Sequence, residues 1–366
     1  MTADAAPPRP RGLLDRLFRS ALVLVPVGVL ANLWWTWYAT DHGVFAHLGR
    51  LPRRYLLLAL ALGLVPWITN ATRMWLWTRF MGLPLRWRDT LRVTLGGELA
   101  SSVLPTSSGN EVMRWGILVQ RGVPQGKAIS IVTLGWLEDS LFFLFAVPTA
   151  VVLSRAWELP VLRAVGRQAR GKVVLIALVA VAVLFALRLL WGAVLIGTLG
   201  EGSRRRGLRW TARVRRRLAR TRADVREVRR LVVARGKGLF LLTWLITGVQ
   251  WCCRYSVVTA LAYFLAPESH VDPVLFFLLQ WVVFTALNFV PTPGASGGAE
   301  AAFVLVYSAL LPASVIGIAT AGWRFLTFYV QLALGSVIFA SLNLADARRA
   351  AQQRGREAAA TAGQSA

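Results

Sequence analysis

The amino-acid sequence predicts an all-α, polytopic membrane protein: a helix bundle of about six spans plus two re-entrant broken hairpins in an inverted repeat. The composition is 56% hydrophobic with a mean hydropathy of +0.53, which is more apolar than a soluble globule can shield. The apolar residues come in runs of span length. Two segments break these runs with proline and glycine at matching places in the two halves.

Six runs each hold about 20 or more mostly apolar positions, the length that a helix needs to cross a hydrocarbon core of roughly 30 Å. Buried strands would give runs of only about 4 to 8 residues, so helices are favoured. Aromatic side chains gather at the ends of the first two runs, as they do at the headgroup level of a bilayer. The predicted spans are residues 20–39, 55–80, 127–153, 173–199, 238–266 and 313–341.

These runs divide the chain into a first membrane half, a basic segment, a second membrane half and two tails. We predict a cytoplasmic N-terminal tail at 1–19, a first half at 20–202 with a re-entrant segment at 93–120, the basic segment at 203–237, a second half at 238–342 with a re-entrant segment at 274–311, and a polar C-terminal tail at 343–366. No cleavable signal is evident, so the first span is expected to stay as an anchor in the inner membrane of a bacterial-type cell.

The net charge of +25 is unevenly placed. Fifteen lysines and arginines against two acids lie between Ser203 and Lys237, and the positive-inside bias puts this segment and both termini in the cytoplasm. The basic loop at 154–172 falls outside in this scheme and counts against it. Apolar residues form a helical stripe within the segment, at Val214, Leu218, Val225, Val228 and Val232.

A basic amphipathic helix of this kind is expected to lie along anionic headgroups. Nucleic-acid binding is the competing interpretation of an arginine-rich stretch, and a position between two spans disfavours it. A plain topology determinant is the third alternative.

The first broken segment is centred on Pro105 and Gly109, has basic residues at both ends, and should enter from the cytoplasm. The second, with Pro291 at its centre, should enter from outside. These two prolines lie 37 and 39 residues after the middle of the preceding span and 34 residues before the middle of the next. This layout is typical of an inverted repeat whose broken helices border a transport site. Two unrelated proline kinks are the alternative.

Charged residues lie in or beside these segments, where a bilayer core penalises each by about 2.5–3.5 kcal/mol on insertion scales. We interpret these residues as a polar cavity for a lipid headgroup, because guanidinium groups and the N-termini of the half-helices both bind phosphate. Acids of the first half could pair with arginines of the second. Internal ion pairs that fix helix packing are the alternative. The charged residues are Arg73, Glu98, Glu111, Arg114, Glu138, Asp139, Arg254, Glu300 and Arg324.

No enzyme centre is evident. The sequence has no Ser/His/Asp set and no phosphate-cradling loop, and Cys252 and Cys253 are adjacent rather than at metal-ligand spacing. We therefore predict no cofactor and no metal.

At the two breaks the sequence resembles the flippase-like family formed by the membrane region of lysylphosphatidylglycerol synthases and their stand-alone relatives. The resemblance covers about residues 55–342. The first family motif is matched by Pro105, Ser107, Gly109, Asn110, Glu111 and Arg114, with Asn110 in place of a glycine; the second by Pro291, Thr292, Pro293, Gly294, Gly297 and Glu300, next to Gly298; and a later aromatic-arginine position by Trp323 and Arg324. The family usually has an arginine where Glu138 and Asp139 stand, so that role does not carry over.

The resemblance implies a lipid translocator that moves an anionic or aminoacylated phospholipid, or a polyprenyl-linked lipid, between leaflets. Fused relatives carry a soluble aminoacyl-transfer domain, and the short polar tail here leads us to expect no synthase activity. A non-transporting scaffold that binds anionic lipid or a partner synthase, and a part in an aminoacyl-lipid synthase system, are the alternatives. The sequence leaves a homodimer open. The predicted substrate-binding residues are Arg73, Glu111, Arg114, Glu138, Asp139, Arg254, Glu300 and Arg324, of which Glu111, Arg114, Glu300 and Arg324 would line the cavity.

Overall fold

A computed structural model describes Trp34 and residues 52–103, 109–155, 212–268, 271–287, 290, 293–295 and 297–364. Within these ranges every regular element is a helix, which confirms the predicted all-α class. The predicted span at 173–199 and, apart from Trp34, the span at 20–39 lie outside the described residues. So do residues 203–211 of the basic segment and four residues of the predicted breaks: Pro105, Ser107, Pro291 and Thr292.

Among the described residues, three helical segments are long and apolar enough to cross a membrane. Two are single helices, α3 and α6. The third joins α13, a π-helical turn η5 and the first part of α14, and it runs over Ala313–Asp346. A fourth candidate is α10, which meets α9 at a 93° bend. The bounds are Arg53–Phe80 for α3, Gln125–Leu153 for α6, Ala212–Arg235 for α9, Lys237–Leu265 for α10, Ala313–Arg324 for α13, Phe325–Tyr329 for η5 and Val330–Gln364 for α14.

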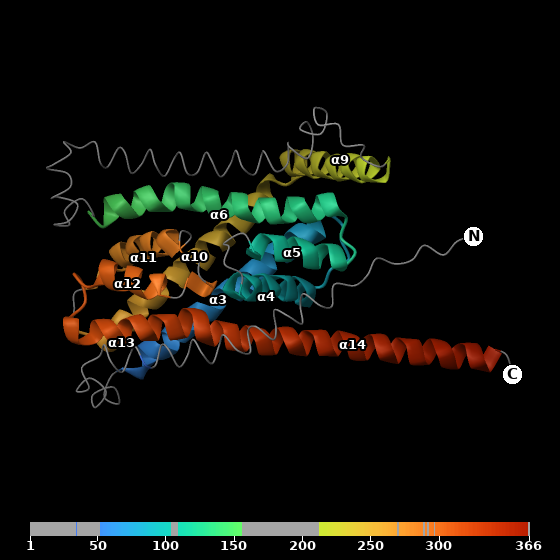
Figure 1. The fold of residues 1–366 in the computed structure, drawn as a ribbon. Helices are drawn as coiled ribbons and strands as arrows, with labels where there is room; N and C mark the ends of the chain where they lie inside the picture. Colours follow the sequence, from blue (N-terminus) through green and yellow to red (C-terminus); the bar gives the residue numbers. More distant parts are fainter. Residues whose placement is uncertain are drawn as a thin grey trace.

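Two helical hairpins enter the bundle from opposite ends (Figure 1). The first is α4 (Trp87–Val103) with α5 (Gly109–Gln120), and the second is α11 (Pro273–Leu287), a short 3₁₀ turn η4 (Pro293–Ala295) and α12 (Gly298–Tyr307). The returning helices α5 and α12 begin at Gly109 and Gly298, at the two breaks that the sequence predicted. The inner ends of the hairpins meet, because η4 packs against α4.

The long helices α3 and α10 pack against each other through the middle of the bundle, and each carries the hairpin that follows it in sequence. Apolar side chains form two main cores. One belongs almost wholly to α3–α6 and includes Trp77, Leu95 and Leu118. The other lies among α10–α13, where the rings of Phe303 and Trp323 stack with centroids 4.9 Å apart. Each half of the chain therefore supplies most of one core, while Ala59 of α3 joins the second core and Phe339 of α14 the first.

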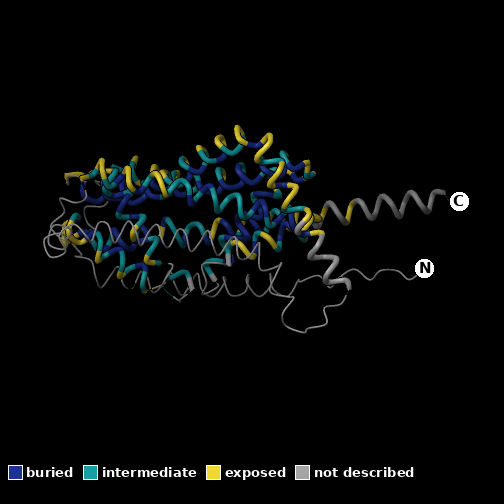
Figure 2. The backbone as a smooth tube through the Cα atoms, turned by 90° about the horizontal axis from the view of Figure 1, so that it is seen from above, coloured by how far each residue is buried: buried dark blue, intermediate teal, exposed yellow. Residues whose placement is uncertain are grey.

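Exposed positions lie along the outside of the bundle and buried positions run through its interior, as Figure 2 shows. Several of the exposed positions are large apolar residues. Leu57, Phe145, Leu245 and Val337 are each more than half exposed. A helix with an apolar outer surface is suited to a lipid environment, because its backbone N–H and C=O groups are hydrogen-bonded within the helix itself.

The basic helix α9 does not present its whole apolar stripe outward. Val228 is only 2% exposed and joins the core of the first half. A Cβ atom at Gly126 of α6 would fall on the side chain of Asp224 and 2.5 Å from the carbonyl oxygen of Thr221, so the two helices touch closely. The opposite face remains exposed, with Arg226, Arg229 and Arg230 among its residues.

Candidate functional site

Arg73 of α3 is the centre of a buried polar cluster. Its Nη1 atom donates to Asp139 Oδ1 at 2.7 Å and to Thr247 Oγ1 at 2.6 Å, and Nη2 donates to Asn70 Oδ1 at 3.3 Å. Its Nε atom lies 3.4 Å from Glu138 Oε2. The guanidinium thus joins α3 to α6 and α10.

Both carboxylates of α6 have further donors. Glu138 is fully buried, and its Oε1 atom accepts from Trp77 Nε1 at 2.7 Å and from Thr243 Oγ1 at 2.6 Å. Asp139 Oδ1 accepts from Trp251 Nε1 at 3.1 Å. A buried charge is tolerated when it is paired and hydrogen-bonded in this way, so the cluster is a consolidated part of the fold.

A second group of charges is held more loosely. Glu98 of α4 lies between two arginines, with 3.5 Å from Oε1 to Arg114 Nη2 and 3.8 Å from Oε2 to Arg254 Nη2. Arg114 belongs to α5 and Arg254 to α10, so Glu98 connects the first hairpin to the second half. These distances exceed the 2.7–2.9 Å typical of a charge-assisted hydrogen bond.

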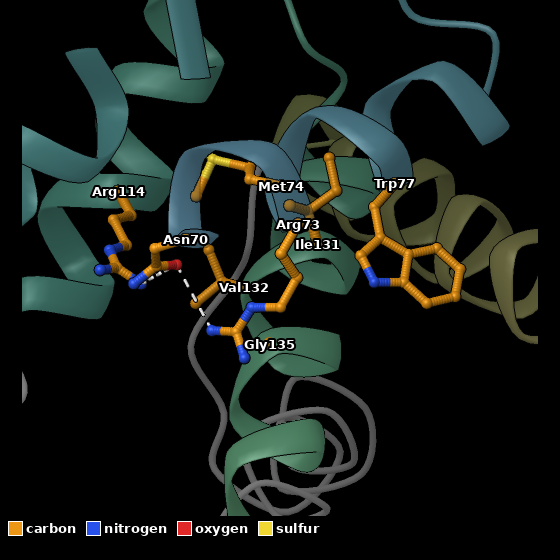
Figure 3. Close-up of a pocket in the computed structure, with 8 residues that line it drawn as sticks. All are labelled: Asn70, Arg73, Met74, Trp77, Arg114, Ile131, Val132 and Gly135. Atoms are coloured by element: carbon orange, nitrogen blue, oxygen red, sulfur yellow. Dashed lines mark hydrogen bonds between the residues drawn. The ribbon is translucent and has the colours of Figure 1, made fainter. Parts of the chain in front are cut away.

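The two groups border one small cavity. Arg73 and Arg114 reach toward Asn70 from opposite sides, as Figure 3 shows, and Arg114 Nη1 lies 3.5 Å from Asn70 Oδ1. The space open to the centre of a water molecule is about 20 Å³, enough for a water molecule but not for a phosphate headgroup. The remaining lining residues are Met74, Trp77, Ile131, Val132 and Gly135.

Arg324 and Glu300 form a third group, at the second hairpin. Arg324 Nε donates to Glu300 Oε1 at 2.9 Å, and Nη2 donates to the carbonyl oxygen of Gly294 at 2.7 Å. Glu300 Oε2 accepts from the backbone N–H of Gly297 at 2.8 Å and so closes the N-terminal turn of α12. The ion pair fixes the loop between η4 and α12, because it satisfies backbone groups that the broken helix leaves open.

Backbone geometry explains the glycines of this loop. Gly294 and Gly297 have φ values of +60° and +82°, in the left-handed region that favours glycine. A Cβ atom at Gly294 would also collide with the ring of Phe328. That ring lies in the π-helical turn η5 and packs 4.4 Å from the guanidinium of Arg324. Local π-helical turns often occur at functional sites.

A fourth charged group closes the outer end of the first hairpin. Asp89 and Arg92 of α4, Arg121 after α5 and Asp346 of α14 form a ring of ion pairs. Arg92 Nη2 also donates to the carbonyl oxygen of Leu342 at 2.6 Å. The ring ties both arms of the hairpin to the last long helix.

The structure distributes the predicted site residues over these groups. Arg73 and Arg114 border the cavity, whereas Glu300 and Arg324 hold the second hairpin and are not among its lining residues. Glu111 is exposed in the first turn of α5. The acids and arginines pair mainly within each half. Apart from the ring at the outer end of the first hairpin, the ion pair that joins the two halves among the described residues is that of Glu98 with Arg254.

Uncharged partners are the residues that sequence reasoning missed. Asn70, Trp77, Thr243 and Thr247 are buried and bind the charged clusters. Their only signal in the sequence is a polar or indole side chain inside an apolar run, which is common in membrane helices. Among the described residues no group of three or more His, Cys, Asp or Glu side chains is placed to hold a metal ion.

Comparison with known proteins relates this chain to a family of membrane proteins. The family described as "Lysylphosphatidylglycerol synthase TM region" matches residues 18–335. A "UPF0104 membrane protein" of Archaeoglobus fulgidus is 22% identical over 291 residues, which cover 77% of this chain and 84% of that relative. The family match extends over most of the chain, including both hairpins and all the charged residues that meet between them, so this chain belongs to the lysylphosphatidylglycerol synthase membrane-region family.

Proposed function

We propose that this protein moves a lipid between the two leaflets of a cell membrane, with the headgroup passing through the polar centre of the bundle and the acyl chains remaining in the bilayer. One observation carries the proposal: two broken hairpins enter from opposite ends, meet inside, and gather charged side chains of both halves there. Irregular backbone and buried charge are costly at membrane depth and persist where they border a polar path.

The arrangement of the helices supports an inverted repeat. In the first half, a hairpin packs between α3 and α6; in the second, a hairpin packs between α10 and α13. Glu138 and Arg324 stand in corresponding places, each 33 residues after the proline of its hairpin. In secondary transporters such repeats place the substrate site near the midplane, at the interface between the repeats.

In this proposal the structure represents a conformation that is closed to the lipid headgroup, and the small size of the cavity supports this interpretation. A space of about 20 Å³ beside Arg114 admits water only, so the headgroup requires the hairpins to move apart. The ion pairs of Glu98 with Arg114 and Arg254 have the longest distances among those described inside the bundle, so we expect them to separate first.

The proposed substrate is an anionic or aminoacylated phospholipid, or a polyprenyl-linked lipid. A phosphate is common to all three, and guanidinium groups bind phosphate oxygens in pairs. The family's description concerns the membrane region of a synthase, so the proposed role here is transport rather than aminoacyl transfer.

A leaflet-accessibility assay tests this function. The purified protein is placed in liposomes with headgroup-labelled phospholipids, and a membrane-impermeant quencher reports how much label has changed leaflet. Wild type should move label, Arg114→Ala should not, and Arg226→Ala on the exposed face of α9 serves as the matched control. If wild type moves no anionic, aminoacylated or polyprenyl-linked lipid, the translocator proposal is wrong.

The exposed arginines of α9 favour a second candidate, a scaffold that binds anionic lipid or a partner enzyme and transports nothing. Because Val228 anchors α9 to the bundle, its basic face stays free for such contacts. If the protein is a scaffold, exchanging Arg226, Arg229 and Arg230 for glutamine should abolish its binding of anionic lipid or of a partner enzyme. If it is a translocator, the same variant should still move label in liposomes.

A further inference from the structure

The arginines inside the bundle differ in how fully their donors are used. Arg73 has polar partners at 2.6, 2.7, 3.3 and 3.4 Å. Arg324 has two strong bonds, at 2.9 and 2.7 Å, and lies over the ring of Phe328. Both guanidinium groups are occupied by the protein itself.

Arg114 and Arg254 are not occupied in this way. Arg114 Nε is buried and has no hydrogen-bond partner among the described residues, and its other contacts, to Glu98 and Asn70, are both 3.5 Å long. Arg254 lies between two aromatic rings, 5.8 Å from the centroid of Trp251 and 5.5 Å from that of Phe284. Among the described residues, its polar contact is the 3.8 Å pair with Glu98.

We propose that Glu98 is an internal counter-ion that neutralises Arg114 and Arg254 when no substrate is bound, and that a phosphate group of the lipid headgroup replaces it on both arginines. The proposal rests on the proposed translocator function and names the anion site within it. Arg73 and Arg324 are then positioning residues that hold the helices, and Arg114 and Arg254 bind the substrate.

Geometry favours the exchange. The carboxylate of Glu98 spans two guanidinium groups, yet it reaches neither at the distance of a charge-assisted hydrogen bond. The phosphodiester of a headgroup has two charged oxygens on a group that is not attached to α4, so it can move between the arginines and bond both at full strength. The three side chains are also accessible, with exposed fractions of 13% for Arg114, 20% for Arg254 and 22% for Glu98, whereas Glu138 is fully buried.

The competing carboxylate also serves turnover. A site that binds its substrate without competition releases it slowly, and passage through a membrane requires binding that is favourable but reversible. Glu98 returns to the arginines as the phosphate leaves. Because Glu98 is on α4 and Arg254 is on α10, the same exchange breaks a side-chain link between the first hairpin and the second half.

Equilibrium binding tests the exchange. The full-length protein in dodecyl maltoside micelles, which carry no phosphate, is titrated with fluorescently labelled phosphatidylglycerol and with diacylglycerol bearing the same label. Glu98→Gln removes the competing charge and should bind phosphatidylglycerol about three- to tenfold more tightly, while Arg254→Gln should bind it about tenfold less tightly. Arg226→Gln should match wild type, and none of the variants should alter diacylglycerol binding.

Several outcomes overturn the proposal. If Glu98→Gln binds phosphatidylglycerol as wild type does, or more weakly as Arg254→Gln is expected to, then Glu98 supports the structure of the site and is not a counter-ion. Displacement of the labelled lipid by inorganic phosphate as readily as by unlabelled lipid would make this a site for free phosphate. If Glu98→Gln does not fold, Glu98→Asp draws the charge back from both arginines, and tighter binding is again expected.

Leaflet crossing separates this proposal from the function on which it rests. Tighter binding by Glu98→Gln in a protein that moves no label would leave the anion site standing and would refute the translocator function. Label crossing that neither Glu98→Gln nor Arg254→Gln alters would leave the translocator standing and would refute the counter-ion role.

Discussion

At the scale of single residues, Arg73 is the buried charge on which we expect the stability of the fold to depend. Arg73 connects three helices through Asp139, Glu138 and Thr247, and its side chain is 3% exposed. An ion pair of this kind adds little net stability over a packed apolar pair, but removal of one member leaves the other charge buried without compensation.

Arg73→Met should therefore destabilise the protein by about 3–5 kcal/mol, seen as a marked fall in the unfolding temperature in detergent. The double variant Arg73→Met/Glu138→Gln should recover part of the loss, because it removes the stranded charge. Arg229→Ala on the exposed face of α9 is the control. Equal unfolding temperatures for Arg73→Met and wild type would show that the cluster does not consolidate the fold.

Pairs of elements depend on close contacts that only small residues allow. At Gly97 of α4, an added Cβ atom would fall on the side chain of Asn110 and 2.9 Å from the Nε atom of Arg114. The two arms of the first hairpin therefore approach as closely as they do because position 97 has no side chain.

Gly97→Ala should displace α5 and Arg114, and we expect it to abolish leaflet crossing and lower the unfolding temperature. Gly116→Ala is the matched control, because it lies in the same hairpin and its Cβ atom would meet nothing within 4 Å. It should be neutral or slightly stabilising, as alanine is the better helix former. Full activity of Gly97→Ala would refute the tight hairpin.

The ring of Asp89, Arg92, Arg121 and Asp346 links the first hairpin to α14 at its outer end. Asp346→Asn and Asp89→Asn should each lower the unfolding temperature, since Arg92 has a side-chain exposure of only 4% and loses a partner in either variant. Their effects should not add, because both act through the same two arginines. A double-variant cycle measures this, and simple additivity would show that the four residues do not act as one network.

At the scale of the whole molecule, charge is concentrated at one end. The first hairpin opens toward the end where α9 and the C-terminal part of α14 lie, and the second opens toward the other (Figure 1). The positive-inside bias predicts that the end with α9 faces the cytoplasm.

Cysteine labelling tests this orientation. In a background in which Cys252 and Cys253 are replaced by alanine, an impermeant maleimide should label Glu268→Cys in intact cells. It should label Arg226→Cys and Arg348→Cys only after lysis. All three positions are exposed, and positions 226 and 348 lie at the end of the bundle opposite to position 268. Labelling of Arg226→Cys in intact cells would invert the proposed topology.

The sequence by itself determined the class of the protein and the positions of its breaks. Span-length apolar runs can only be helices in a bilayer, because each backbone group must be satisfied within its own segment. The predicted spans at 55–80, 127–153 and 238–266 each agree within two residues with a helix, and Gly109 and Gly298 begin the two returning half-helices. The family that the sequence resembles is confirmed by the match over residues 18–335.

Only the tertiary structure decided what each charge does. Charged residues stand out in an apolar run, but their partners lie far away along the chain: Thr247 is 174 residues from Arg73, and Asp346 is 254 residues from Arg92. Which arginines the protein saturates and which have only long polar contacts depends on how α3, α6 and α10 cross. The sequence does not show that Arg73 has a partner at 2.6 Å and Arg254 one at 3.8 Å. Local order is encoded along the sequence, whereas electrostatic complementarity arises between helices that the fold brings together.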